Sequence, residues 1–287
     1  MNTPLRVRAL TRADLAFADR VRELAGWNQT RADWERFLAT EPDGCFLAEW
    51  NGQPAGTATT TVYGSALAWI GMVLVHPDAR RRGIGSALLR HCMDCLRKRG
   101  VRSVKLDATP LGRPLYQSLG FEDEWPLARW AGASPPPTPS RSDPRLRPWD
   151  PKDTPSVQRL DEAAFGISRQ RILHLMLPQT QAAWIFESEP GRISGYGMLR
   201  AGSRAFYLGP VAAESAEAGI GLAERLLAGC PGQPVYWDIP EANEPAIAWA
   251  GRIGLAVQRP LMRMFAGVNL APGDPRRQFA LAGPEIG

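Results

Sequence analysis

The chain has little lysine, few cysteines and no long apolar run. Basic residues number 34 against 29 acidic ones, for a net charge of +5, and only Lys98, Lys105 and Lys152 are lysines. No long Lys/Arg run or recognised nucleic-acid motif occurs, so we expect no nucleic-acid partner. No stretch of about 18 apolar residues and no apolar leader occurs either, which predicts no membrane contact and a cytoplasmic protein.

Two of the four cysteines, Cys92 and Cys95, form a C-x-x-C pattern without a second cysteine pair. They lie in a segment whose apolar residues recur at helical spacing, at Leu88, Leu89, Cys92 and Leu96. This pattern is typical of buried packing, so we expect no metal site.

The 287 residues are enough for two domains, and 44% hydrophobic residues are enough for a core. Residues 131–145 are so rich in proline that they cannot continue a helix or a sheet. We therefore expect one domain over residues 1–130, a linker over 131–145 and a second domain over 146–287.

The first half predicts alternating strands and helices. Thr11 and Thr30 each begin a helix with an aspartate three residues later, and Asn51-Gly52 predicts a hairpin turn. We expect strands at 5–10, 45–50, 55–63, 68–75 and 101–106, and further helices at 86–99 and 113–119.

The second half repeats this plan. Strands are expected at 146–149, 183–188, 195–201, 206–211 and 235–237, and helices within 155–177, 216–228 and 244–253. Pro148 favours an edge position for the strand at 146–149. A short sequence motif also recurs, because Gly83-Ile84-Gly85 is repeated as Gly219-Ile220-Gly221. The halves are interpreted as one duplicated fold.

An apolar strand ending at Val75 is followed by an Arg- and Gly-rich loop that opens a helix. Glycines 83 and 85 allow the backbone to approach an anion, and the N–H groups of the first helical turn point at it. Arg80, Arg81 and Arg82 supply cationic donors. The pattern predicts a pyrophosphate site.

Two motifs in order give the first half its resemblance to a known family. Arg80-x-x-Gly83-x-Gly85 follows the strand, and Tyr116-x-x-Leu-Gly-Phe121 comes one strand and one short helix later. Together they resemble the GNAT superfamily of acetyl-CoA-dependent N-acetyltransferases. The segments 26–29, 69–72 and 106–110 resemble a subgroup with two tandem domains.

The resemblance implies an α/β (α+β layered) fold class with two tandem GNAT-type domains. Each would have a mixed, mostly antiparallel central sheet flanked by helices. It also implies acetyl-CoA as cofactor, with the pantetheine arm on the backbone of a strand that separates from its neighbour. The implied cofactor-binding residues are Val73, Leu74, Val75, Arg80, Arg81, Arg82, Gly83, Ile84, Gly85 and Ser86. The alternative is a solvated arginine cluster.

Tyr116 matches the family's usual general acid, because a phenol is protonated at neutral pH and can donate to a thiolate. Its alternative is a core tyrosine. Many members place a glutamate on the strand before the glycine loop, but residues 69–75 contain no carboxylate. Deprotonation through water or through Asp107 remains open, and Asp107 could equally cap the turn at Thr109. His76 is interpreted as structural.

Acceptor contacts are expected from both halves. In this fold the first two helices wall the acceptor site, so Trp27 and Asn28 are candidates, with a helix cap as the alternative. Trp237 and Asp238, at the end of a strand in the second half, are further candidates. The alternative is a solvated turn, which explains them almost as well.

The second copy departs from the motifs. Aligned on Gly-Ile-Gly, the three arginines become Ala216, Glu217 and Ala218, and Tyr116 becomes Ala250. We therefore expect it to be a degenerate GNAT-like domain that packs on the first as an intramolecular pseudo-dimer and shapes the acceptor pocket.

The resulting hypothesis is an N-acetyltransferase that moves an acetyl group from acetyl-CoA to a primary amine of a small molecule. A non-catalytic acyl-CoA-binding or sensor protein is the alternative. A nucleic-acid-binding protein that uses the arginine loop is a third class. The acceptor cannot be read from the sequence, because acceptor specificity in this fold lies in variable walls.

Overall fold

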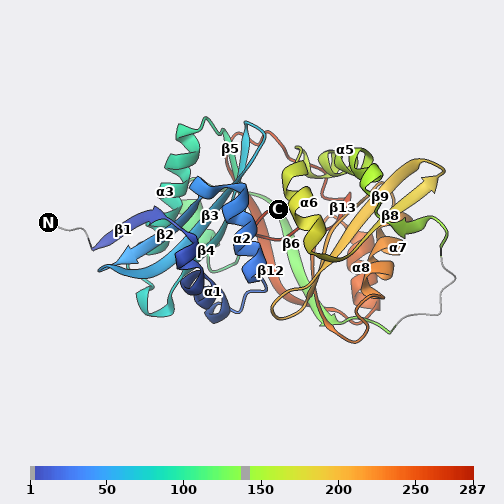
Figure 1. Ribbon diagram of the computed structural model, residues 1–287, viewed down its shortest axis with the longest axis horizontal. Helices are drawn as coiled ribbons and strands as arrows, with labels where there is room; N and C mark the ends of the chain where they lie inside the picture. Colours follow the sequence, from blue (N-terminus) through green and yellow to red (C-terminus); the bar gives the residue numbers. More distant parts are fainter. Residues whose placement is uncertain (1–3, 137–142) are drawn as a thin grey trace.

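The computed structural model describes residues 4–136 and 143–287, which form two lobes side by side (Figure 1). Residues 137–142 of the expected linker lie outside the described residues. The first half of the chain contains the following strands and longer helices: β1 (Leu5–Ala9), α1 (Leu15–Leu24), α2 (Arg31–Thr40), β2 (Cys45–Trp50), β3 (Gln53–Tyr63), β4 (Leu67–Val75), α3 (Ile84–Lys98), β5 (Ser103–Ala108), α4 (Arg113–Ser118) and β6 (Glu122–Ala133).

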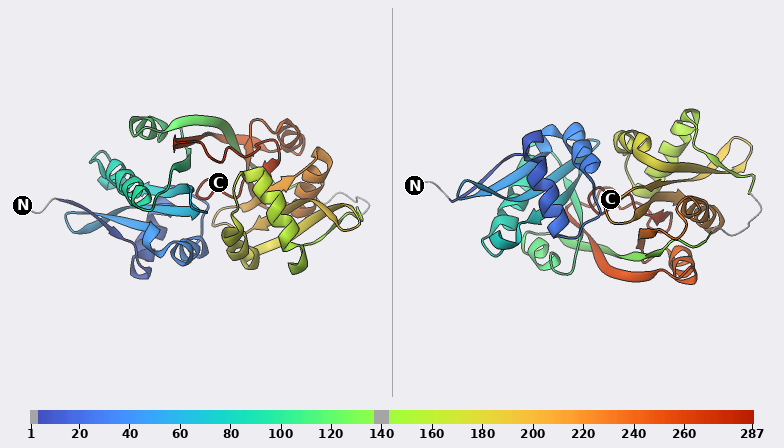
Figure 2. Two further views of the ribbon diagram at one scale, coloured as in Figure 1. Left: turned by 90° about the horizontal axis from the view of Figure 1, so that it is seen from above. Right: turned by 60° about the horizontal axis from the view of Figure 1, so that its bottom comes forward.

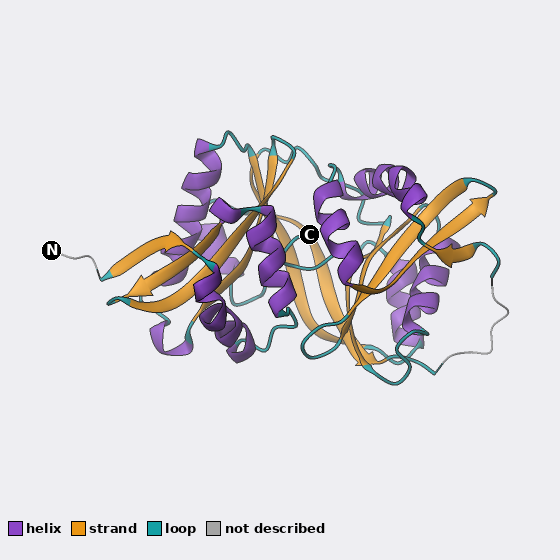
Figure 3. Ribbon diagram, viewed as in Figure 1, coloured by secondary structure: helices purple, strands orange, loops and turns teal. Residues whose placement is uncertain are grey.

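The second half repeats this order of elements. Its strands and longer helices are β7 (Leu146–Pro148), α5 (Thr154–Phe165), α6 (Gln170–Met176), β8 (Thr180–Glu189), β9 (Arg192–Arg200), β10 (Phe206–Ala213), α7 (Ala216–Leu227), β11 (Pro234–Pro240), α8 (Glu244–Arg252), β12 (Ala256–Gly267) and β13 (Gln278–Ala280). As Pro148 predicted, β7 ends the sheet. The mixed, mostly antiparallel sheets flanked by helices confirm the expected fold class (Figure 3).

Local signals in the first half formed as predicted. Thr11 with Asp14, and Thr30 with Asp33, make capping boxes in which each aspartate also accepts the threonine N–H. Asn51 and Gly52 both have positive φ, as a tight hairpin turn requires. Cys92 is buried and Cys95 half-buried on α3, and both are free thiols.

The two halves exchange a strand. The sheet order is β1-β2-β3-β4-β5-β12-β6-β11-β10-β9-β8-β7, so β12 of the second half pairs with β5 and β6 of the first half pairs with β11. In Figures 1 and 2 these two long strands run from one lobe to the other. The sheet is therefore continuous through the whole molecule.

The pattern did not predict β6 or β12. Each contains a proline, Pro126 and Pro260, which removes a donor and is rare inside a sheet. β6 also runs to Ala133, inside the range expected to be linker. The strands pair in antiparallel fashion with Leu127 opposite Leu261 at the centre.

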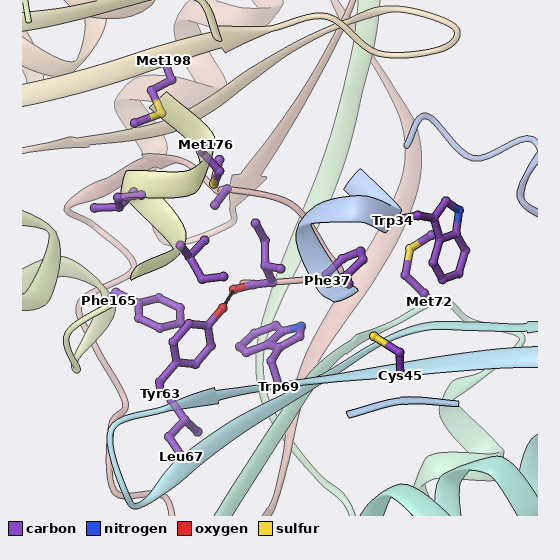
Figure 4. Packing of buried hydrophobic residues seen from close by; sticks show 14 of the residues in the cluster. Trp34, Phe37, Cys45, Tyr63, Leu67, Trp69, Met72, Phe165, Met176 and Met198 are labelled. Atoms are coloured by element: carbon purple, nitrogen blue, oxygen red, sulfur yellow. Dashed lines mark hydrogen bonds between the residues drawn. The ribbon is translucent and has the colours of Figure 1, made fainter. Parts of the chain in front are cut away.

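One apolar cluster spans both lobes. Figure 4 shows Tyr63 and Trp69 of the first half against Phe165 of α5, with Tyr63–Phe165 ring centroids 5.3 Å apart. Residues 281–287 lie against these side chains. Tyr63 Oη donates to the Ile286 carbonyl at 2.7 Å, and Trp69 Nε1 donates to the Pro284 carbonyl at 2.9 Å. We call residues 281–287 the tail segment.

Among the described residues, none of the helices combines the length and the apolarity needed to span a bilayer.

Candidate functional site

Strands β4 and β5 separate partway along their length. Their parallel pairing covers only Leu67–Trp69 with Ser103–Lys105. Further on, Met72 has φ of 50° and the β3–β4 register shifts, which marks a bulge. Beyond Trp69 the backbone of β4 is therefore no longer paired with β5. This is the separation expected for a strand that receives a pantetheine arm.

A cavity lies at this separation. In the first half, its walls come from parts of β4 and β5, from the loop between α1 and α2, and from Tyr116. The other walls come from β12 and the tail segment. The lining of the cavity includes Trp27, Gln29, Val73, Asp107, Tyr116, Arg259 and Glu285. Both halves of the chain therefore build the site.

The loop between β4 and α3 carries exposed positive charge. Gly83 is the N-cap of α3 with φ of 76°, and Arg81 also has positive φ, at 60°. The first helical bond runs from Ala87 N–H to the Gly83 carbonyl at 3.0 Å, so the donors before it have no carbonyl in the preceding turn. Within residues 4–136 and 143–287, Arg80, Arg81 and Arg82 make no ion pair. This geometry suits an anion.

Tyr116 is half-buried on α4, where its ring packs edge-on against Phe121 at 6.0 Å between centroids. Burial raises the pKa of Tyr116 to about 12. The phenol therefore keeps its proton throughout the neutral range and can act as a proton donor in the cavity.

Asp107 lines the cavity, but both of its carboxylate oxygens are occupied. Arg263 of β12 donates to Oδ1 at 2.9 Å and to Oδ2 at 3.0 Å. Arg263 lies between the Trp69 and Trp125 rings, 4.5 and 4.1 Å from their centroids. This bidentate pair joins β5 to β12 and leaves Asp107 poorly suited to act as a base. Asp107 does not cap the turn at Thr109 either, because the Gly112 N–H there donates to Thr109 Oγ1.

Of the two acceptor candidates in the α1–α2 loop, Trp27 lines the cavity. Asn28 instead joins the halves: its Oδ1 accepts the N–H groups of Arg204 and Ala205, and its Nδ2 donates to the Ala205 carbonyl, all at 3.0 Å. Its amide is used within the protein rather than open to an acceptor.

Trp237 and Asp238 are not at the cavity. Both are fully buried, and Trp237 Nε1 donates to the Phe279 carbonyl at 2.8 Å. Asp238 accepts two bonds from Arg129, at 2.7 and 2.6 Å, and one from Tyr207 at 2.8 Å. The expected solvated turn is therefore wrong, and so is the placement of these residues at an acceptor pocket.

The sequence patterns do not identify Arg259 or Glu285 as site residues. Gln29 is included only within the segment 26–29, without a predicted role. Arg259 lies on β12 and Glu285 on the tail segment, which reach the cavity only through the exchanged topology. No local pattern around either residue signals this placement.

In the second half, the corresponding groove is filled by the chain itself. β10 pairs with β11 only over Phe206–Leu208, and β13 then pairs with β10 at Val211 and Ala212. Only Glu214 and Ser215 separate β10 from α7, so the arginine loop has no counterpart. The Gly-Ile-Gly motif of the second half lies inside α7 rather than at the N-cap of the helix.

Comparison with known proteins agrees with this architecture. Residues 12–121 match the acetyltransferase (GNAT) family, and residues 157–280 match an acetyltransferase (GNAT) domain. The chain is 26% identical over 263 residues to the holothin acyltransferase of Pseudoalteromonas sp. (strain SANK 73390), covering 91% of this chain and 87% of that protein.

A second relative is the uncharacterized N-acetyltransferase YitH of Bacillus subtilis (strain 168), 28% identical over 177 residues. The match covers 62% of this chain and 62% of the length of that relative. The crystal structure of a putative acetyltransferase from Pyrococcus horikoshii shares the fold, with a TM-score of 0.85 at 23% identity over 100% of this chain and 97% of that one. The chain belongs to the GNAT superfamily of acetyltransferases and carries two GNAT domains in tandem.

Proposed function

We propose that this protein transfers an acetyl group from acetyl-CoA to the primary amine of a small molecule, with the cofactor held by the first half of the chain. The observation that carries the proposal is the separation of β4 from β5, which opens onto a cavity that contains Tyr116. The relatives support an acyltransferase in general, whereas the donor and acceptor rest on this site.

The residues present fit acetyl-CoA on two observations. The backbone of β4 beyond Trp69 is free of β5, and the open N–H groups at the start of α3 stand beside unpaired arginines. Val73, Leu74 and Val75 would hold the pantetheine arm through their backbone. The loop residues Arg80, Arg81, Arg82, Gly83, Ile84, Gly85 and Ser86 would hold the pyrophosphate.

When bound, acetyl-CoA supplies the acetyl group as a thioester. Tyr116 Oη holds a proton at neutral pH and would donate it to the leaving sulfur, and the proton that the amine nitrogen loses as the amide forms would restore the phenol. Trp27 lines the cavity and would limit the access of water to an acceptor bound there. Asp107, paired with Arg263, holds β5 and β12 in register.

The test is release of free thiol from acetyl-CoA in the presence of a broad panel of primary amines, with mass spectrometry of the products. The proposal expects amine-dependent thiol release and an acetylated product. Tight CoA binding without release for any amine would instead favour a non-catalytic acyl-CoA-binding protein.

A further inference from the structure

Two residues that line the cavity each have a buried polar atom without a partner. Among the described residues, Arg259 Nε and Gln29 Oε1 are buried without a hydrogen bond. One is a donor that carries positive charge, and the other is an acceptor. Buried polar groups without partners are rare and costly, so each points to a group that a ligand would supply.

Arg259 differs from three other arginines that lie where the two halves meet. Arg129, Arg169 and Arg263 are each paired with a buried aspartate. Arg259 makes no ion pair in the part of the chain that the structure describes, and it lies opposite Arg129 in the β12–β6 register. Asp238, the acid beside them, already accepts two bonds from Arg129 and one from Tyr207.

The half-buried guanidinium of Arg259 therefore lies beside a second cation without an ion-pair partner of its own, and the nearby Asp238 compensates its charge only in part. Burial and Arg129 lower the pKa of Arg259, and Asp238 opposes them only in part. An anion from a ligand would relieve that cost and take the open Nε–H.

The other polar group has the opposite character. Gln29 Nε2 donates to Glu285 Oε2 at 2.7 Å, and a carboxylate at that distance can only accept, so the orientation of the amide is fixed. Gln29 Oε1 is then an open acceptor beside a carboxylate. Both residues line the same cavity, and their oxygens are hydrogen-bond acceptors.

Glu285 also takes the place of a β4 side chain. A Cβ on Gly71 would clash with the Glu285 backbone, so the tail segment lies directly over the strand that contains no carboxylate of its own. The charges of Arg200, Asp33 and Arg36 also act on the Glu285 carboxyl, the two arginines lowering its pKa and the aspartate raising it. Burial raises the pKa of Glu285 above its usual value, toward that of a group able to hold a proton.

We propose that this cavity binds an amine that also carries an anionic group, with Arg259 binding the anion and Gln29 with Glu285 receiving the ammonium. The proposal rests on the transferase function above. The ammonium gives one proton to the Glu285 carboxylate, which leaves the neutral amine, and the carboxyl then returns that proton to water. Both poles come from segments that the strand exchange and the tail bring to the first half.

The test uses binding rather than turnover. α-, β- and γ-amino acids with unsubstituted chains are titrated into the protein by calorimetry in the presence of CoA, each paired with its methyl ester. At least one acid should bind tenfold or more tightly than its ester. Equal binding of acid and ester in every pair, or no binding by any probe, overturns the proposal.

Variants assign the two poles. In Arg259→Met the preference for acid over ester should fall below twofold, and Arg259→Lys should restore part of it. The exposed Arg252→Met on α8 is the matched control and should keep the full preference. A full preference retained in Arg259→Met overturns the assignment of the anion.

For the ammonium pole, Glu285→Gln should weaken the amino acid at least fivefold but leave the binding of the matching carboxylic acid without an amine unchanged. If this variant does not fold, Gln29→Met removes the open acceptor and should have the same selective effect. Equal weakening of both probes would contradict the proposal.

The outcomes separate this proposal from the transferase itself. Thiol release with uncharged amines, without any preference for the acid over the ester, overturns the acceptor class but leaves the transferase function intact. Binding that prefers the acid, without thiol release for any amine, contradicts the transferase function instead.

Discussion

Asp107 and Arg263 face each other across β5 and β12 and are joined by two hydrogen bonds, of 2.9 and 3.0 Å. Asp238 and Arg129 repeat the arrangement across β11 and β6. In each pair one residue belongs to the first half and the other to the second. The exchanged strands are thus held by two equivalent buried ion pairs.

We expect Arg263→Met to lower the free energy of unfolding by about 3–5 kcal/mol, because it leaves the Asp107 carboxylate buried without its partner. Both side chains are nearly inaccessible, at 3% and 0% exposure. Chemical denaturation measures the loss. The control is Arg97→Met, whose ion pair with Asp94 is exposed and should be worth about 0–1 kcal/mol. Equal effects of the two variants would contradict the structural role.

Charge reversal in the arginine loop should abolish most cofactor affinity. In Arg82→Glu we expect the dissociation constant of CoA to rise at least tenfold, about 1.4 kcal/mol, since a cation at the pyrophosphate becomes an anion. Calorimetry measures this constant. Arg90→Glu, exposed further along α3, serves as the control with little change. Unchanged affinity in Arg82→Glu would remove the loop from the cofactor site.

Tyr116→Phe should lower kcat by about 100-fold, because the variant removes the proton donor, with CoA affinity near that of the original protein. The pH profile gives a second check. Because burial raises the pKa of Tyr116 to about 12, loss of its proton should not reduce the rate of the original protein below roughly that pH. Full activity of Tyr116→Phe would exclude it as the acid.

The ring of Phe279 covers Gly219 of α7, so that a Cβ at this glycine would clash with the ring. Gly219→Ala should therefore destabilise the protein by about 1–3 kcal/mol through overpacking. Gly251→Ala is the matched control, because this helical glycine has open space around it and should be neutral or slightly stabilising. A neutral Gly219→Ala would mean that the second groove is loosely filled.

The features readable from the sequence are those that depend on neighbours along the chain. The glycine loop before α3, the capping boxes at Thr11 and Thr30, and the Asn51-Gly52 turn all depend on residues a few positions apart. The halves also repeat in the order predicted, because each half has its own periodicity.

The acceptor side could not be read in the same way. Pro126 and Pro260 interrupt the strand pattern of β6 and β12, so neither strand is predicted. The pairing of β12 joins Arg263 to Asp107 and brings Arg259 to the cavity. Glu285 meets Gln29 across 256 positions of the sequence. Such contacts follow from topology and burial, to which a local pattern is blind.

Hydrogen–deuterium exchange with and without acetyl-CoA tests the central claim most directly, namely that the first half alone forms the cofactor site. The account predicts slower exchange of the amides in residues 72–75 and 81–86 on addition of acetyl-CoA. It predicts no change in residues 206–221, where β13 and Phe279 already fill the groove. Protection of residues 206–221, or none in the β4–α3 segment, would contradict it.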